Sequence, residues 1–118
     1  MVRTYVTGVA KVEVNRRTGG IQLMHFWCTN DCGQMSNPDG MKAQVESNII
    51  HTFCRTLKEE LTFDRGSVTS LDWASYPATS FSEVPEIVVD LIDHTAEPPW
   101  GAGEPTTTIA PSSGSSAA

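Results

Sequence analysis

The first part of the chain alternates apolar and polar residues as a β-hairpin does. Residues 6–14 place apolar side chains at 10, 12 and 14 with charged residues between them, a period that predicts a half-buried strand. Residues 15–20 are turn formers, and residues 21–28 are typical of a second, more apolar strand. The two stretches therefore predict a β-hairpin.

A long amphipathic helix is predicted next. Asn37 followed by Pro38 is typical of a helix start, because Asn accepts from free backbone N–H groups and Pro has the φ of a first helical residue. Apolar residues then recur at helical spacing, at 41, 45, 49, 53 and 57. We expect a helix over about 38–60. Polar side chains also accompany its first turns: Gln44, Glu46 and Asn48.

Two further strand-forming stretches complete the pattern. Residues 60–63 and 68–73 flank Asp64-Arg65-Gly66, which predicts a second hairpin with Gly66 at a positive φ. Residues 85–93 predict a last strand, apolar at 87, 89 and 91 on one face and at 88 and 92 on the other. The whole pattern predicts an α+β fold, in which antiparallel strands pack against one long helix.

The chain divides into a foldable part and a polar tail. Its 118 residues are enough for one domain with a modest core. Apart from Pro111, residues 111–118 are only Ser, Gly and Ala, a composition typical of a flexible tail. We expect one domain over 1–110, followed by this tail over 111–118.

The formal net charge of -6 argues against a nucleic-acid-binding protein, which needs a basic face to neutralise phosphates. Anionic membranes are disfavoured for the same reason. No segment approaches the ~20 apolar residues of a membrane span, and the first residues lack the basic-then-apolar pattern of a secretion signal. We expect a cytoplasmic protein, or a periplasmic one if a partner is exported.

The three cysteines, Cys28, Cys32 and Cys54, indicate free thiols in a reducing compartment, because their number is odd and no secretion signal is seen. With His25 and His51 they supply five possible zinc ligands. In a strand, however, His25 and Cys28 point to opposite faces, and Cys54 fits equally well in a helix core. A small metal-binding domain is the weakest alternative.

A candidate general base lies near the end of the predicted domain. Gly103-Glu104-Pro105 places a carboxylate between a residue that lets the backbone approach a ligand and one that stiffens it. Such a turn suits a general base, but the same tripeptide also occurs in ordinary surface turns. From these residues alone, both interpretations stay open.

Eight short motifs follow one another along the chain. They are Asp31-Cys32-Gly33, Asn37-Pro38-Asp39-Gly40, Ala43-Gln44-Val45-Glu46, Leu57-Lys58-Glu59-Glu60, Tyr76-Pro77, Pro85-Glu86-Ile87, Pro98-Pro99 and Gly103-Glu104-Pro105. In order and spacing they resemble the C-terminal segment of the molybdopterin-binding large subunit of xanthine oxidase-family molybdenum hydroxylases. The nearest resemblance is to isoquinoline 1-oxidoreductase and aldehyde dehydrogenase β-subunits. It covers about residues 8–111.

The resemblance implies a site. In the family the Glu of Gly-Glu-Pro, here Glu104, stands beside the molybdenum and acts as general base in the hydroxylation of aldehydes or N-heterocycles with oxygen from water. Gln44 is similar to the glutamine that contacts the pterin, and an amide suits a pterin edge because it both donates and accepts hydrogen bonds. Gly103 lets the peptide lie close against the cofactor. Glu46 has no implied role beyond helix structure.

The resemblance also implies an assembly. The family's large subunit is far longer, so most molybdopterin contacts and the substrate funnel are expected on another molybdopterin-subunit chain. Relatives pass electrons through a separate iron–sulfur subunit. Beyond Ala110-Pro111 the family continues into a helix rich in alanine, where this chain has Ser-Ser-Gly-Ser-Ser.

Two hypotheses follow from these resemblances and departures. The first is a component of a molybdenum hydroxylase that completes a shared cofactor site and is inactive alone. The second is a non-catalytic remnant or interaction module that keeps the fold without cofactor.

Overall fold

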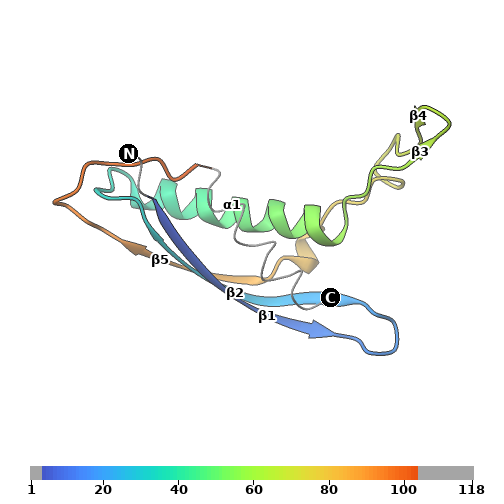
Figure 1. Ribbon diagram of the computed structural model, residues 1–118. Coiled ribbons are helices and arrows are strands. Elements are labelled where there is room, and N and C mark those ends of the chain that lie inside the picture. Colours follow the sequence, from blue (N-terminus) through green and yellow to red (C-terminus); the bar gives the residue numbers. More distant parts are fainter. Residues whose placement is uncertain (1–3, 104–118) are drawn as a thin grey trace.

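The computed structural model describes residues 4–103, which form a three-stranded sheet with one long helix against one face (Figure 1). The sheet has the order β1-β2-β5, with bounds Tyr5–Val14 for β1, Ile21–Asp31 for β2 and Glu86–Ile92 for β5. The helix α1 spans Pro38–Leu57. Between α1 and β5 lie β3 (Phe63–Asp64), β4 (Ser67–Val68) and the 3-10 helix η1 (Phe81–Glu83). The predicted α+β fold with one long helix on the sheet is confirmed.

The sheet is mixed, which the sequence pattern did not reveal. β1 and β2 form the predicted antiparallel hairpin, from Tyr5 opposite Asp31 to Val14 opposite Ile21. β5 instead pairs in parallel with β2. A parallel pair needs a crossover of about a dozen residues or more, and α1 with the segment after it supplies that connection. The apolar pattern of residues 85–93 fits a strand of either direction.

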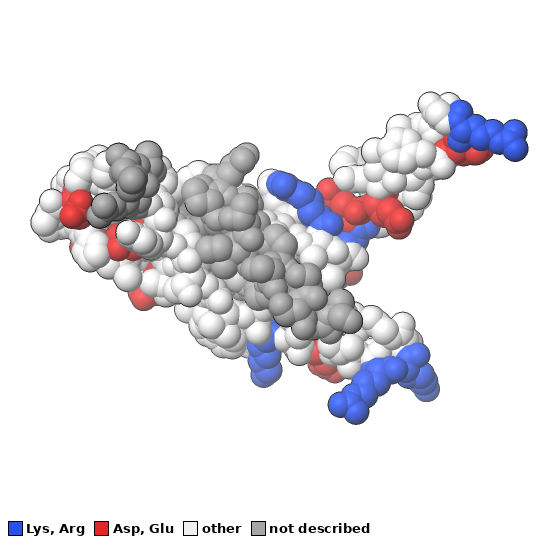
Figure 2. All heavy atoms as spheres, in the orientation of Figure 1, with Lys and Arg blue, Asp and Glu red and all other residues white. Residues whose placement is uncertain are grey.

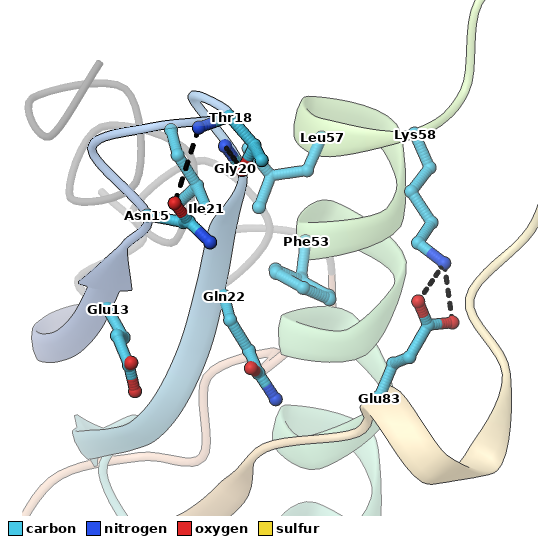
Figure 3. A pocket seen from close by; sticks show the side chains of 10 residues that line it. All are labelled: Glu13, Asn15, Thr18, Gly20, Ile21, Gln22, Phe53, Leu57, Lys58 and Glu83. Atoms are coloured by element: carbon cyan, nitrogen blue, oxygen red, sulfur yellow. Dashed lines mark hydrogen bonds and ion pairs between the residues drawn. The ribbon is translucent and has the colours of Figure 1, made fainter.

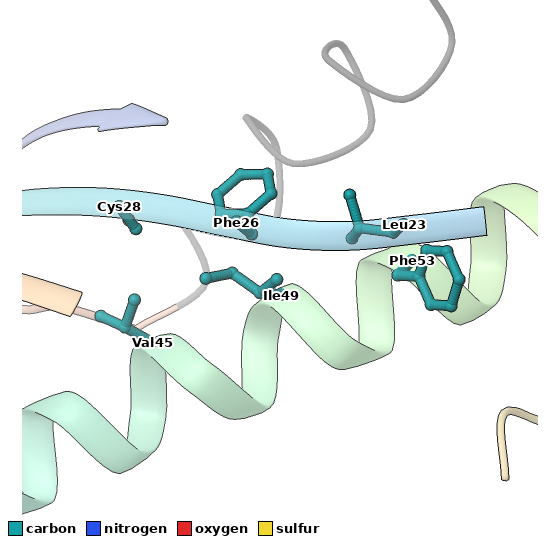
Figure 4. Close-up of a cluster of buried hydrophobic side chains, with 6 residues drawn as sticks. All are labelled: Leu23, Phe26, Cys28, Val45, Ile49 and Phe53. Carbon is teal, nitrogen blue, oxygen red and sulfur yellow. The ribbon is translucent and has the colours of Figure 1, made fainter. Parts of the chain in front are cut away.

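The core is a layer between α1 and the sheet (Figure 4). Three side chains of α1, four residues apart, form one buried cluster with three side chains of β2; they are Val45, Ile49 and Phe53, with Leu23, Phe26 and Cys28. Burying a side chain of this size stabilises the fold by about 1.5–3 kcal/mol. The predicted apolar stripe of the helix is therefore the face that holds α1 to the sheet.

The ends of α1 follow from local hydrogen bonds. The Asn37 side chain accepts from the Gly40 N–H at 2.9 Å, and Pro38 occupies the first turn, as the sequence predicts. The helix ends at Leu57, earlier than the expected 60, because the N–H groups of Lys58 and Glu59 both turn back to the Cys54 carbonyl oxygen.

After α1, the chain forms a projecting arm, residues 59–80, which carries the β3–β4 hairpin away from the sheet (Figure 1). Gly66 has a φ of 98°, so the predicted turn is confirmed, although its strands are shorter than expected. Within residues 4–103, no helix combines the length and the apolar character that a membrane span requires.

Candidate functional site

Gln44 and Gly103, two of the predicted site residues, line the same groove at the start of α1. The groove has a volume of about 440 Å³ and is open to solvent. It is lined by residues of the loop before α1, of the first turns of α1 and of a later segment: Gln34, Ser36, Asn37, Gly40, Met41, Gln44, Pro99, Trp100, Ala102 and Gly103. The fold thus brings residues far apart in sequence to one place.

We call the later segment, residues 93–103, the strap. It leaves β5 and turns back along the start of α1, where Figure 1 draws it in orange to red. Backbone hydrogen bonds hold it to the loop after β2: the Trp100 N–H donates to the Cys32 carbonyl oxygen at 2.7 Å, and the Gln34 N–H donates to that of Glu97 at 3.3 Å. A contact of 2.9 Å between His94 Nδ1 and Asp31 Oδ2 joins the side chains of the strap and β2.

Gly33 lets the strap lie this close to the loop. Its φ is 79°, in the left-handed region that favours glycine. A Cβ atom at this position would overlap the Pro98 carbonyl oxygen, so no other residue fits without moving the strap. The glycine of the Asp31-Cys32-Gly33 motif is therefore required by packing.

Asn48 holds the end of the strap. Its side chain is 6% exposed on the buried side of α1, and Nδ2 donates to the Gly103 carbonyl oxygen at 2.8 Å. Asn48 lies one helical turn after Gln44. Gly103 is thereby fixed beside the groove. Glu104, the predicted general base, is the next residue in the chain and lies outside the described residues.

The groove can bind one edge of a flat polar ligand. The exposed Gln44 amide offers both a donor and an acceptor, and the partly buried Trp100 ring forms an apolar wall. The start of α1 adds little to these groups, because Pro38 has no N–H and the N–H groups of Gly40 and Met41 both donate to Asn37. Because these groups lie on one side only, they cannot enclose a ligand.

Within residues 4–103, the cysteines and histidines weighed as zinc ligands are not gathered into one cluster. Cys28 and Cys32 are buried, and His25 lies on the opposite face of the sheet, stacked on Trp27 with ring centroids 5.5 Å apart. Burial raises the pKa of the Cys32 thiol, and the Asp31 and Asp93 carboxylates raise it further, which disfavours the thiolate that binds zinc. Residues 4–103 contain no group of three or more His, Cys, Asp or Glu that could hold a metal ion.

A second hollow, of about 470 Å³, lies near the other end of α1 (Figure 3). Phe53 and Leu57 point from α1 toward Ile21, whereas Lys58 and Glu83 pair on the other side of the helix. Two pairs of its polar residues interact with each other: the Asn15 side chain accepts from the N–H of Thr18 at 3.3 Å, and Lys58 pairs with Glu83.

Comparison with known proteins identifies the domain. Residues 1–85, which include β1, β2, α1 and Gln44, match the model of the molybdopterin cofactor-binding domain. The chain belongs to this family. This molybdopterin cofactor-binding domain is 40% identical over 96 residues to the B subunit of nicotinate dehydrogenase from Pseudomonas putida, a match covering 81% of this chain and 8% of that protein.

Two further relatives agree. The beta subunit of isoquinoline 1-oxidoreductase from Brevundimonas diminuta is 32% identical over 89 residues, covering 75% of this chain and 11% of that protein. In the crystal structure of quinoline 2-oxidoreductase from Pseudomonas putida 86, 14% of one chain matches 88% of this chain, with a TM-score of 0.80 and 27% identity. The resemblance to a segment of the xanthine oxidase-family large subunit is thus confirmed. The chain spans about a tenth of the length of these relatives.

Sequence patterns do not reveal the residues that position the strap. They mark Asn48 only as a polar residue of the helix, and they predict no role for Gly33 or Trp100. One signal is available for Asn48: it falls beside Ile49 and three residues after Val45, on the stripe that the apolar spacing predicts to be buried. A polar residue on such a stripe needs a hydrogen-bond partner.

Proposed function

We propose that this domain is a component of a molybdenum hydroxylase, in which Glu104 acts as general base and Gln44 contacts the pterin. One observation carries the proposal. Gly103, the residue before Glu104, is hydrogen-bonded to α1 one turn after Gln44, so the two predicted cofactor-binding residues, Gln44 and Gly103, line one groove. Chance placement of a surface turn would not require that convergence.

The groove residues fit one edge of a pterin. Such an edge alternates hydrogen-bond donors and acceptors, which the Gln44 amide matches. The Trp100 ring and the Gly103 backbone offer flat surfaces for close contact. When bound, the molybdenum cofactor supplies the redox chemistry. Gln44 would hold and orient it, and the Glu104 carboxylate would accept a proton from the attacking oxygen.

To act as a general base, Glu104 requires a second protein chain that closes the site. A general base works best with a pKa near the working pH, and a carboxylate reaches that value when water is excluded around it. The open groove of this domain does not exclude water. We therefore propose that another molybdopterin-subunit chain closes the site, that an iron–sulfur subunit receives the electrons, and that the domain alone is inactive.

The names of the relatives point to two substrate classes. Nicotinate, isoquinoline and quinoline, in the names of three proteins similar to this chain, are all N-heterocycles. A membrane-bound aldehyde dehydrogenase of Gluconacetobacter polyoxogenes is also similar, at 31% identity over 101 residues. We propose hydroxylation of an N-heterocycle or an aldehyde.

The test is purification of the tagged protein from its native host with its partners. The proposal expects molybdenum and pterin in the complex, and loss of turnover with retained cofactor in Glu104→Gln. A folded protein without metal, pterin or partner would overturn it.

A second candidate is an interaction module that keeps the fold without cofactor. The open groove and the exposed arm favour it. It predicts a stable complex with a partner that contains no pterin, and no effect of Glu104→Gln on any property of that complex.

A further inference from the structure

The arm, residues 59–80, exposes large apolar side chains to solvent. Trp73 and Leu71 are each 82% exposed, Phe63 is 66% exposed and Leu61 is 51% exposed. Exposure of several such side chains on one short projection costs solubility unless another surface covers them. Single exposed apolar residues need no explanation, but this group does.

The hairpin of the arm has one polar and one apolar face. Phe63 pairs with Val68 across the two strands, so their side chains share a face. On the other face the Thr62 hydroxyl lies 2.6 Å from that of Thr69, and the Thr69 N–H donates to the Thr62 carbonyl oxygen at 2.9 Å. The polar face therefore has hydrogen bonds of its own, whereas on the apolar face Phe63 and Val68 are 66% and 38% exposed.

The arm is held in place at its root. The Tyr76 hydroxyl donates to Glu59 Oε2 at 2.7 Å, and the Thr79 N–H donates to Cys54 Sγ at 3.2 Å. Next to Trp73, the Asp72 carboxylate accepts from the Ser75 N–H at 2.9 Å. Apolar residues on a fixed support lose little conformational entropy when they bind.

We propose that the exposed apolar side chains of the arm dock onto the remainder of a molybdopterin-binding subunit carried by another chain. This proposal rests on the proposed function, and it identifies the surface of this chain that binds the other chain. The homologous segment is 8% of the nicotinate dehydrogenase relative, so more than nine tenths of such a protein lies outside this chain and is available to cover the arm.

The distribution of charge on the arm agrees with this occupant. In Figure 2 its charged atoms gather at the tip and at the root, and the part between them is white. An apolar centre with a polar rim is the usual composition of a protein interface. The residues of this chain outside the described range contribute few large apolar side chains, namely Met1, Val2 and Ile109.

The test uses two double variants of the full chain. Leu71→Ser with Trp73→Ser removes apolar side chains of the arm, and Asp64→Asn with Arg65→Gln changes only the charged tip. Each is mixed with the B subunit of Pseudomonas putida nicotinate dehydrogenase from which the segment similar to this chain has been deleted. Affinity is measured by titration, and circular dichroism checks that the fold of each variant is unchanged.

The expected result is binding of the wild-type chain and of the tip variant within roughly twofold of each other, with the Leu71/Trp73 variant weaker by at least roughly tenfold. Equal binding by both variants would overturn the arm proposal and leave the proposed function standing. No binding by the wild-type chain would count against the companion-chain function itself. Self-association that the Leu71/Trp73 variant abolishes would assign the arm to a second copy and overturn the proposal.

Discussion

The Asn48 side chain, on the buried side of α1, donates a hydrogen bond of 2.8 Å to the Gly103 carbonyl oxygen, 55 positions later in the chain. This contact fixes the last described residue before Glu104 next to the groove that Gln44 lines. The position of Gly103 thus depends on Asn48, a residue for which no contact with the cofactor is predicted.

Replacing Asn48 by Ala should loosen the end of the strap. The Gly103 carbonyl oxygen loses this donor, and we expect the free energy of unfolding to fall by about 1–3 kcal/mol. Amide hydrogen exchange should become faster at residues 101–103 and stay unchanged in β2. Ser47→Ala, on the neighbouring exposed position, is the control and should have little effect. Equal exchange in both variants would show that Asn48 does not hold the strap.

Replacing two glycines that share one backbone conformation distinguishes the energetic cost of backbone strain from the cost of disturbed packing. Gly33 and Gly19 have φ values of 79° and 74°, but only Gly33 has a neighbour within 4 Å of an added Cβ. Gly19→Ala should cost about 1–2 kcal/mol, the cost of the left-handed conformation alone. Gly33→Ala should cost more, about 3–5 kcal/mol, because the strap must move. Urea denaturation of both variants measures the difference, and equal costs would contradict the close packing of loop and strap.

The ion pair between Lys58 and Glu83 makes the free energy of unfolding depend on pH. Hydrogen bonds from the Lys58 ammonium group, and then from the Ser80 hydroxyl and N–H, lower the pKa of Glu83 from 4.5 to about 2. The folded state binds this proton less readily than the unfolded state, so the stabilisation is complete above pH 4.5 and is lost as the pH falls toward 2. Glu83→Gln should lower the free energy of unfolding at neutral pH. The free energy of unfolding of this variant should also fall less steeply than that of the wild-type protein between pH 4.5 and about 2.

Chemical denaturation between about pH 2 and pH 7 checks this expectation. Glu60→Gln, at an exposed position, controls for the loss of one negative charge. If the wild-type protein and Glu83→Gln show parallel pH profiles, the pair does not stabilise the fold.

Gln44 and Glu104 should have separable roles in the assembled enzyme. Gln44→Ala removes a contact with the cofactor, so pterin per purified complex should fall. Glu104→Gln keeps the shape and removes the base, so pterin should stay while turnover falls by a factor of about 10²–10⁴. Pterin fluorescence and steady-state turnover, measured on the same preparations of both variants, test whether the two roles are separate. Parallel loss of both quantities in both variants would indicate only structural roles.

The sequence predicted the elements well because their signals are local. The Asn37-Pro38 start and the spacing of 45, 49 and 53 are properties of neighbouring residues, and both are confirmed in α1. The first hairpin is confirmed for the same reason. The direction of β5 was not predictable, because its alternation of apolar residues is the same in a parallel and in an antiparallel pair.

The site was only partly predictable. Gln44 and Gly103 came from the family resemblance, and the structure brings them to one groove. The strap was not foreseen, because its contacts join residues such as Gly33 and Pro98 that carry no periodic pattern and meet only after folding. The assigned roles of Gln44, Gly103 and Glu104 remain predictions.

The central claim, a cofactor site shared with a companion chain, is tested most directly by the molybdenum content of the complex purified through this chain from its native host. Metal analysis by mass spectrometry, with the protein amount determined on the same sample, gives the ratio. The account predicts stoichiometric molybdenum in a complex that contains a second molybdopterin-binding chain. A stable, folded complex without molybdenum would contradict it.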